Sequence, residues 1–260
     1  MTSEINHNPL PKRWKIHHLI PGDINDALKD FSPLMRQLLY NRGFTDADSA
    51  SYFLEGTVGY ATTPFLIKDM TLAVERLHQA ILEGEKIVIY GDYDADGVTS
   101  AALLDRFFDA LGVSSHVYIP NRYDEGYGLN EDAIRQLAGE GANLIITVDC
   151  GVRAVEEVNL ANQLGVDVIV SDHHQPGPEL PPAVAVIDPK QTGDTYPEKY
   201  LAGVGLAYKL AQAYLKDHPQ EGVNADDWLD LVAIGTVADL APLRGENRML
   251  VKNGLEQIRY

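Results

Sequence analysis

Short apolar runs alternate with helical patterns between residues 72 and 187, and this alternation limits the possible folds more than any other feature of the chain. Apolar runs predict strands at residues 87–90, 116–119, 144–148, 168–170 and 183–187. Helical patterns lie between them at residues 72–83, 98–111, 130–140 and 154–164. Strands that alternate with helices form a parallel sheet covered on both faces. The sequence therefore predicts an α/β fold with a mostly parallel, twisted sheet and helices on both faces.

The regions on either side of this alternation are predicted to be mainly helical. We expect residues 1–70 to form a small N-terminal helical segment, residues 71–245 to form the main domain, and residues 246–260 to begin an inter-domain helix. Residues 227–240 are apolar on nearly every side, which predicts a buried helix. Asp239 near its end would then be partly buried and would need a partner, for which a metal ion is one candidate.

Composition and charge narrow the class of protein. The 260 residues are 45% hydrophobic and 23% charged, which is ordinary for a soluble globular protein with a large core. The sequence has no apolar run of transmembrane length, no signal-peptide core, and a single cysteine, Cys150, so we expect a cytoplasmic protein without membrane contact. The formal net charge of −17 argues against a general basic surface for nucleic acid. It is compatible with a nuclease whose acidic residues hold metal ions.

Acidic side chains cluster directly after the first of these predicted strands, in the stretch KIVIYGDYDADGVTS at residues 86–100. Asp92, Asp94 and Asp96 occupy alternate positions, and carboxylates this close repel one another unless cations neutralise them. An EF-hand loop fits the first six positions, but its twelfth position, which should be glutamate, is Leu103, and a strand precedes it. A solvated acidic turn remains an alternative. A site for hard divalent cations is the favoured interpretation.

Two further predicted strands also end in acidic or imidazole groups. Asp149 follows the strand at residues 144–148, and Asp172, His173 and His174 follow the next one. Because the carboxyl ends of parallel strands meet at one edge of a sheet, we expect these groups to lie together, with Asp239 as a further carboxylate. Carboxylates with one histidine, and one acid shared between two ions, form a two-metal site for phosphoryl transfer. The imidazole favours Mn²⁺ over Mg²⁺, and Asp172 is expected to orient His173.

These residues belong to motifs that resemble a known family. Four stretches of the chain resemble, in order and spacing, the four motifs of the DHH phosphoesterase superfamily. They are GDYDADGVTSAALL, TVDCG, SDHH and AIGTVADLAPL. Two further stretches, PNRYDEGYGL and LAGVGLAYKL, resemble more specifically the RecJ family of bacterial exonucleases. The resemblance covers residues 86–260. It implies a metal-dependent 5′-to-3′ exonuclease for single-stranded DNA that releases 5′-mononucleotides in DNA repair and recombination, with two Mn²⁺ or Mg²⁺ ions as cofactors.

The resemblance also implies a role for individual residues. It assigns the metal ligands as Asp94, Asp96, Asp149, His173 and Asp239, with Asp149 bridging the ions. His174 would contact the scissile phosphate, and Asp92 would be a further ligand or would anchor a metal-bound water, so both are catalytic candidates.

A few residues are expected to contact a substrate phosphate. The resemblance implies that Arg122 grips a phosphate, which its planar fork suits, and Gly97 and Ser100 lie at a predicted helix N-terminus. Gly203 and Gly205 could do likewise, but we favour close packing, because the pair does not complete a dinucleotide-binding fingerprint.

Other functions stay open at this point. One alternative is a DHH phosphodiesterase that acts on short oligonucleotides or cyclic dinucleotides, and another is a non-catalytic replication scaffold. A pyrophosphatase is disfavoured, because those relatives begin the first motif with a histidine near the position of Tyr90. The RecJ family continues into a DHH-associated domain and an OB-type fold, and we expect both to be missing here, through excision of a fragment or natural truncation. We therefore expect strand binding and polarity to depend on those parts, and single-stranded-DNA-binding protein and a helicase to be partners of the full-length protein.

Overall fold

The structure is a computed structural model that describes residues 13, 15–55, 62–121, 126 and 128–259. Contacts between Cα atoms divide the chain into two compact units, Met1–Thr57 and Val58–Tyr260. The 3-10 helix η1 (Pro64–Leu66) belongs to the second unit, whereas the boundary expected from the sequence lay at residue 70. Among the described residues, no helix is both long enough and apolar enough to span a bilayer.

The first unit contains short helices. They are α1 (Gly22–Ala27), α2 (Pro33–Tyr40) and α3 (Ala47–Glu55). The Ser32 side chain accepts a hydrogen bond from the Met35 backbone N–H and so caps α2, with Pro33 at the first helical position. Leu28, Leu39 and Ala50 form its buried core. None of the candidate site residues lies in this unit.

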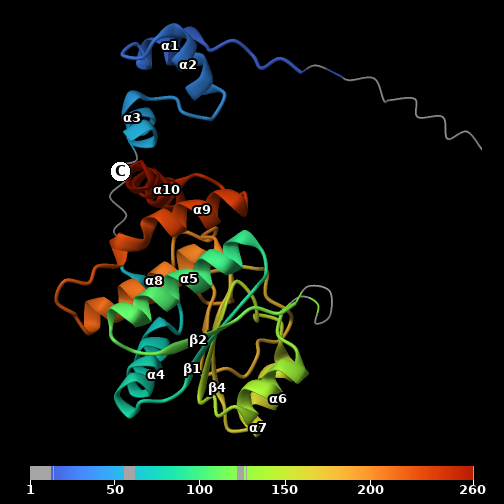
Figure 1. The fold of residues 1–260 in the computed structure, drawn as a ribbon. Coiled ribbons are helices and arrows are strands. Elements are labelled where there is room, and N and C mark those ends of the chain that lie inside the picture. Colours follow the sequence, from blue (N-terminus) through green and yellow to red (C-terminus); the bar gives the residue numbers. More distant parts are fainter. Residues whose placement is uncertain (1–12, 14, 56–61, 122–125, 127, 260) are drawn as a thin grey trace, which may run out of the picture. The chain divides into compact units, whose positions relative to one another are not determined.

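The second unit is built around a parallel five-stranded sheet with the order β2-β1-β3-β4-β5 (Figure 1). Its strands are β1 (Ile87–Gly91), β2 (Ser115–Tyr118), β3 (Leu144–Val148), β4 (Asp167–Ser171) and β5 (Ala185–Ile187). All the strands are parallel, but β2 is added on one side of β1 and the later strands are added on the other side. The order of the strands therefore reverses between β1 and β3. Ligands of such sheets bind beyond the carboxyl ends of the strands at this switch point.

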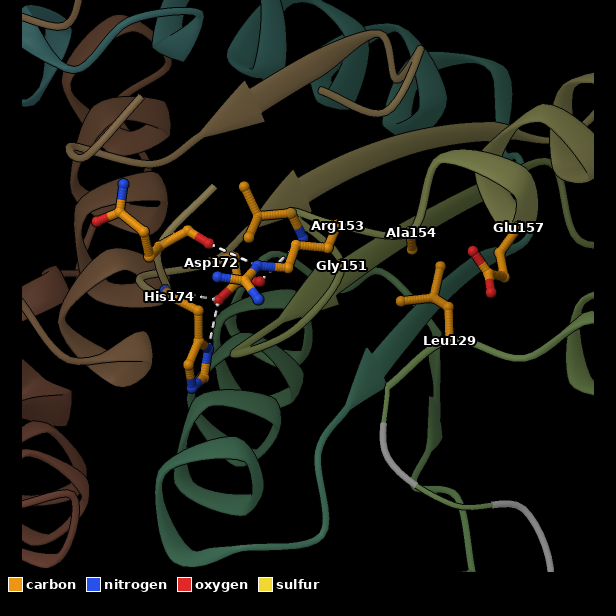
Figure 2. A pocket seen from close by; sticks show the side chains of 9 residues that line it. Leu129, Gly151, Arg153, Ala154, Glu157, Asp172 and His174 are labelled. Atoms are coloured by element: carbon orange, nitrogen blue, oxygen red, sulfur yellow. Dashed lines mark hydrogen bonds and ion pairs between the residues drawn. The ribbon is translucent and has the colours of Figure 1, made fainter. Parts of the chain in front are cut away.

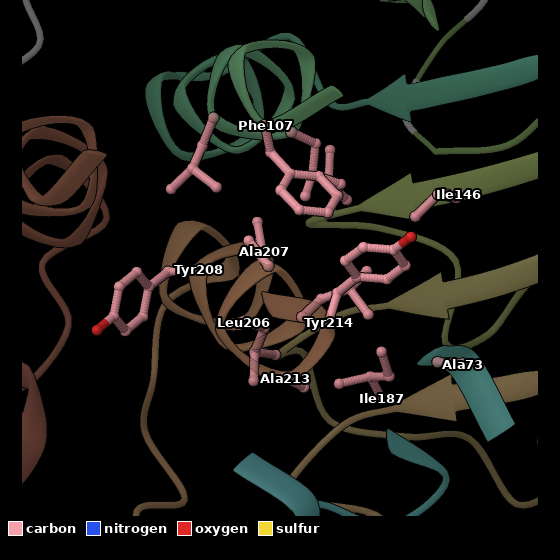
Figure 3. Packing of buried hydrophobic residues seen from close by; sticks show 14 of the residues in the cluster. Ala73, Phe107, Ile146, Ile187, Leu206, Ala207, Tyr208, Ala213 and Tyr214 are labelled. Atoms are coloured by element: carbon pink, nitrogen blue, oxygen red, sulfur yellow. The ribbon is translucent and has the colours of Figure 1, made fainter. Parts of the chain in front are cut away.

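Helices cover both faces of the sheet, as the sequence predicts (Figure 1). They are α4 (Met70–Glu83), α5 (Ala95–Ala110), α6 (Glu131–Gly139), α7 (Val155–Gln163), α8 (Gly203–Asp217), α9 (Leu229–Ala238) and α10 (Gly245–Ile258), with the 3-10 helix η2 (Ala225–Trp228) before α9. Alternate strand residues face opposite sides, so Ile87 and Ile89 join one apolar cluster and Val88 and Tyr90 join the other. Figure 3 shows the first cluster, where Phe107 and Tyr214 pack beside Ile146.

The helix expected at residues 227–240 differs from the prediction. It is divided into η2 and α9, and α9 packs against α5, α8 and α10 but leaves part of its surface uncovered. Ile234 and Val237 consequently remain 47% and 46% exposed, so the prediction of a helix buried on all sides is wrong. Asp239 follows the last turn of α9, where its side chain keeps 25% of its exposure.

Candidate metal centre

The loop after β1 places its first acidic residues by capping α5. Asp94 is the N-cap, and its Oδ1 accepts hydrogen bonds from the backbone N–H groups of Asp96 at 2.9 Å and Gly97 at 3.0 Å. Such a cap satisfies helix donors and places negative charge at the positive end of the helix. The helix therefore begins at Ala95, earlier than the residue 98 expected from the apolar pattern, and its first turn carries Asp96 into the interior.

Asp96 is 1% exposed and is held by the start of another helix. Its Oδ2 accepts a hydrogen bond from Gly203 N at 2.6 Å, and its Oδ1 accepts one from Val204 N at 2.9 Å, both at the first turn of α8. Burial raises the pKa of Asp96 to about 6, and these backbone donors partly oppose that rise. The N-terminus of α5 thus binds the carboxylate of Asp94, and the N-terminus of α8 binds the carboxylate of Asp96.

Asp149 lies directly after β3 and is the most unusual acid of the site. It is 1% exposed, and its backbone has a φ of 62°, in the left-handed region. Burial, followed by the charges of Asp96 and Asp94, raises the pKa of Asp149 to about 10. Strained backbone and a strongly shifted pKa together are typical of functional sites.

His173 faces three carboxylates. Its Nε2 lies 3.1 Å from Asp149 Oδ1, 3.7 Å from Asp96 Oδ2 and 4.0 Å from Asp239 Oδ1. This buried nitrogen nevertheless has no hydrogen bond within the described parts of the chain. An imidazole nitrogen aimed at several acidic oxygens without hydrogen-bonding geometry has the surroundings of a metal ligand.

The side chains form overlapping groups that could each hold an ion. The groups are Asp92, Asp94 and Asp149; Asp96, His173 and Asp239; and Asp149, His173 and His174. Within each group the donor atoms lie within 4.8 Å of one another. Asp92 is also buried, with a raised pKa caused mainly by burial, and its Oδ1 has no hydrogen bond among the described residues. Oxygen donors with one or two imidazoles fit Mn²⁺ or Mg²⁺, so the donor set agrees with the expected cofactors.

Asp172 orients a different histidine from the one expected. Its Oδ1 accepts a hydrogen bond from the His174 backbone N–H at 3.0 Å and lies 2.8 Å from His174 Nδ1. This contact raises the pKa of His174 to about 9. His173 is instead held through its carbonyl oxygen, which accepts a hydrogen bond from Lys190 Nζ. The expectation that Asp172 orients His173 is thus corrected.

Gly97 and Ser100, which were expected to bind a substrate phosphate, form hydrogen bonds within the protein. The Gly97 N–H is already bonded to Asp94, and a side chain at Gly97 would meet the Asp92 carbonyl oxygen at 2.5 Å. Ser100 is fully buried, and its hydroxyl donates to the Asp96 carbonyl oxygen at 2.6 Å. The structure thus gives both residues a part in packing the acidic loop instead of a phosphate contact. Arg122 lies outside the described residues.

The sequence analysis missed other residues that build the site. Asp188 follows β5, is fully buried, and has a pKa that burial raises to about 7. The rule that found the other acids, an acidic residue directly after a strand, would have found it too. Lys190 and Gly203 carry no such local signal, because they act through contacts with residues distant in the sequence.

A parallel sheet with carboxylates and imidazoles gathered at the carboxyl ends of its strands defines a class of metal-dependent phosphoesterases. The chain belongs to the DHH family: the model described as "DHH family, N-terminal domain" matches residues 86–236.

The relatives within this family are more specific. The chain is 48% identical over 249 residues to a protein of Bacillus subtilis named "Single-stranded-DNA-specific exonuclease RecJ", an alignment that covers 95% of this chain and 31% of the relative. The Escherichia coli protein of that name is 39% identical, over 90% of this chain and 42% of the relative. A crystal structure of RecJ with Mn²⁺ from Thermus thermophilus matches with a TM-score of 0.77 at 32% identity, over 95% of this chain and 35% of that one. This chain thus spans less than half the length of these relatives.

The raised pKa values of the buried carboxyl groups predict that the metal-free protein loses stability as pH rises and that bound metal restores it. The pKa values of Asp96 and Asp149 are raised to about 6 and about 10 from a usual 3.8, so their protonated forms stabilise the metal-free fold. That contribution is complete below the usual value and is lost as pH rises through the raised values. In EDTA, the melting temperature should therefore fall between about pH 5 and pH 8.

Mn²⁺ should reverse this trend, because it binds the ionised carboxylates and competes with protons. At about 100 times its dissociation constant, a bound ion adds about 2.7 kcal/mol to the free energy of unfolding. Differential scanning fluorimetry with and without Mn²⁺ at both pH values measures the effect, and Asp149→Asn should flatten both trends. A metal-free protein that becomes more stable towards pH 8 and ignores Mn²⁺ would contradict the prediction.

Proposed function

We propose that the chain is the catalytic part of a metal-dependent exonuclease that hydrolyses single-stranded DNA from the 5′ end and releases 5′-mononucleotides. The observation that carries this proposal is the position of Asp149, which belongs to one group with Asp92 and Asp94 and to another with His173 and His174. A single carboxylate shared between neighbouring groups is the arrangement that a two-metal site requires. The names of the relatives supply the substrate class.

The metal centre would hold two divalent ions, Mn²⁺ or Mg²⁺. Asp94 and Asp149 would hold one, with Asp92 as a further ligand or an anchor for bound water. The ligands of the other would be Asp96, Asp149, His173 and Asp239. When bound, the ions supply Lewis-acid stabilisation of charge on the phosphoryl oxygens and activation of water.

The protein's own groups complete the chemistry. His174 is 46% exposed at its side chain and is held by Asp172, so we assign this imidazole to a contact with the scissile phosphate. The raised pKa of His174 keeps the imidazole protonated at neutral pH. It can therefore donate a hydrogen bond to the charge that develops on a phosphoryl or leaving oxygen. Lys190 and the N-terminus of α8 fix His173 and Asp96, which limits movement of the ligands during the reaction.

The wider setting follows from the same proposal. We infer a role in DNA repair and recombination in the cytoplasm, where the substrate is single-stranded DNA. Parts of a longer protein would supply the grip on the strand that a chain with a net charge of −17 lacks. Single-stranded-DNA-binding protein and a helicase would be partners of that longer protein.

Digestion of end-labelled oligonucleotides tests the function. With Mn²⁺, a 5′-labelled single strand should release labelled mononucleotide from the start, whereas a 3′-labelled strand should shorten gradually and a matching duplex should resist. EDTA should stop the reaction. Hydrolysis of dinucleotides without hydrolysis of the long strand would indicate a phosphodiesterase for short oligonucleotides. Stabilisation by Mn²⁺ without hydrolysis of either substrate would indicate a non-catalytic scaffold.

A further inference from the structure

A cavity of about 460 Å³ opens beside the metal centre (Figure 2). It lies between the loop that follows β3 and the loop that follows β4, with Leu129 from the segment before α6 on its far wall. Its volume falls within the range of roughly 300–1,000 Å³ that is usual for small-molecule sites. The mechanism proposed above uses only one end of this cavity, the end at which His174 stands.

The cavity and the metal centre share a wall. His174 Nδ1 lies 4.0 Å from Asp149 Oδ1, so one imidazole borders both spaces. Asp172 contacts residues on both sides of this wall. Its Oδ1 lies 2.8 Å from His174 Nδ1, and its Oδ2 accepts a hydrogen bond from Val152 N at 2.9 Å. The cavity is therefore within reach of a molecule whose phosphate lies at the metal centre.

The far end of the cavity has a chemistry that suits a neutral group. Figure 2 shows Leu129, Ala154 and Glu157 on the side away from His174. Leu129 and Ala154 contribute apolar lining at this end, whereas the Glu157 carboxylate would repel a phosphate. The phosphate is thus directed to the metal centre, and an uncharged ring or sugar is accepted at the far end.

Arg153 adds a flat surface to the cavity. Its Nε donates a hydrogen bond to the Gln175 carbonyl oxygen at 2.7 Å, which fixes the guanidinium plane although the residue is exposed. Guanidinium planes stack on nucleobases of any sequence, and each base–side-chain stack contributes about 1–3 kcal/mol. Stacking of this kind gives affinity without selecting a particular base.

We propose that this cavity binds the sugar and base of the nucleotide whose phosphate occupies the metal centre. The inference rests on the proposed function and deepens it, because it assigns a nucleoside subsite to the β3–α7 and β4–β5 loops. Apolar walls and a stacking surface make the subsite tolerant of all bases, as a nuclease without sequence preference requires.

Calorimetric titration of the Mn²⁺-loaded protein tests the subsite without any need for turnover. Deoxyadenosine 5′-monophosphate should bind at least about tenfold more tightly than inorganic phosphate, in line with one stacked base. Ala154→Phe, which fills the cavity, and Arg153→Ala, which removes the stacking surface, should each weaken nucleotide binding by about tenfold and leave phosphate binding unchanged. Asn159→Phe, an exposed position on α7 outside the cavity lining, is the control for a large side chain on the same helix.

Equal affinity for nucleotide and phosphate in the unsubstituted protein would overturn the inference, as would unchanged nucleotide binding in both cavity variants. If Ala154→Phe fails to fold, Arg153→Ala decides the result, because that residue is exposed. Failure of the subsite is distinguishable from failure of the proposed function. If only the subsite proposal fails, phosphate still binds and long strands are still hydrolysed. If only the proposed function fails, the nucleotide binds at the cavity but no strand is hydrolysed.

Discussion

Replacing Asp149 with asparagine should abolish hydrolysis of single-stranded DNA while the fold persists. Asp149 Oδ1 lies 3.1 Å from His173 Nε2, and the residue also belongs to the group that contains Asp92 and Asp94. Its loss would weaken both proposed ion positions together. Loss of several kcal/mol of transition-state stabilisation lowers the rate by at least about 10³-fold.

Asparagine is the informative replacement for two physical reasons. The φ of 62° at position 149 is in the left-handed region, which asparagine tolerates better than alanine does. Burial raises the pKa of Asp149 to about 10, so the metal-free carboxyl is neutral at pH 7, and the amide is its neutral isostere. Because the amide needs no proton, the variant should melt at least as high as the unsubstituted protein in EDTA at pH 7 but lose the stabilisation by Mn²⁺.

The measurements are the initial rate on an end-labelled strand, the melting temperature in EDTA, and calorimetric titration with Mn²⁺. Asp109→Asn, at an exposed position on α5, removes the same charge without touching the metal centre and should keep full activity. Near-normal hydrolysis by Asp149→Asn would disprove a bridging role for this carboxylate. Unfolding of the variant in EDTA would show instead that the carboxyl group has a structural function.

The acidic residues of the site could be predicted because their placement follows from a local rule. A parallel sheet brings the carboxyl ends of its strands to one edge, so Asp92 and Asp149, which follow β1 and β3, must lie near each other. The short apolar runs that define the strands are themselves clear in the sequence, since β1 and β3 are buried along their whole length. The fold and the location of the site therefore needed no information about distant contacts.

The finer arrangement depended on contacts that have no local signature. Asp94 accepts backbone hydrogen bonds and starts α5 three residues earlier than the apolar pattern suggests, which buries Asp96. Either histidine could have been the partner of Asp172, because both follow it at short range, and only the loop geometry selects His174. The hydrogen bond from Gly203 to Asp96 spans 107 positions in the sequence, so no window of neighbouring residues could reveal it.

Gly203→Ala should disable the metal centre through a single added carbon atom. A Cβ at position 203 would lie 2.7 Å from Asp149 Cβ and 2.9 Å from its Cγ, closer than any normal contact. Either the start of α8 must move, which breaks the hydrogen bonds from Gly203 and Val204 to Asp96, or Asp149 must move. A displacement of about 1 Å at a reacting site costs about 10²-fold in rate, so we expect at least that loss together with weaker Mn²⁺ binding.

Gly205→Ala is the matched control on the same helix. The nearest atoms to a Cβ at position 205 would be those of the Leu201 side chain, at 3.4 Å, which is ordinary van der Waals contact. Alanine favours a helix over glycine by about 0.5–1 kcal/mol, so this variant should be as active as the unsubstituted protein and slightly more stable. The same propensity acts at position 203, where any loss of activity must therefore come from the contact with Asp149. Equal rates and equal Mn²⁺ affinities for the two variants would show that the start of α8 does not position the metal ligands.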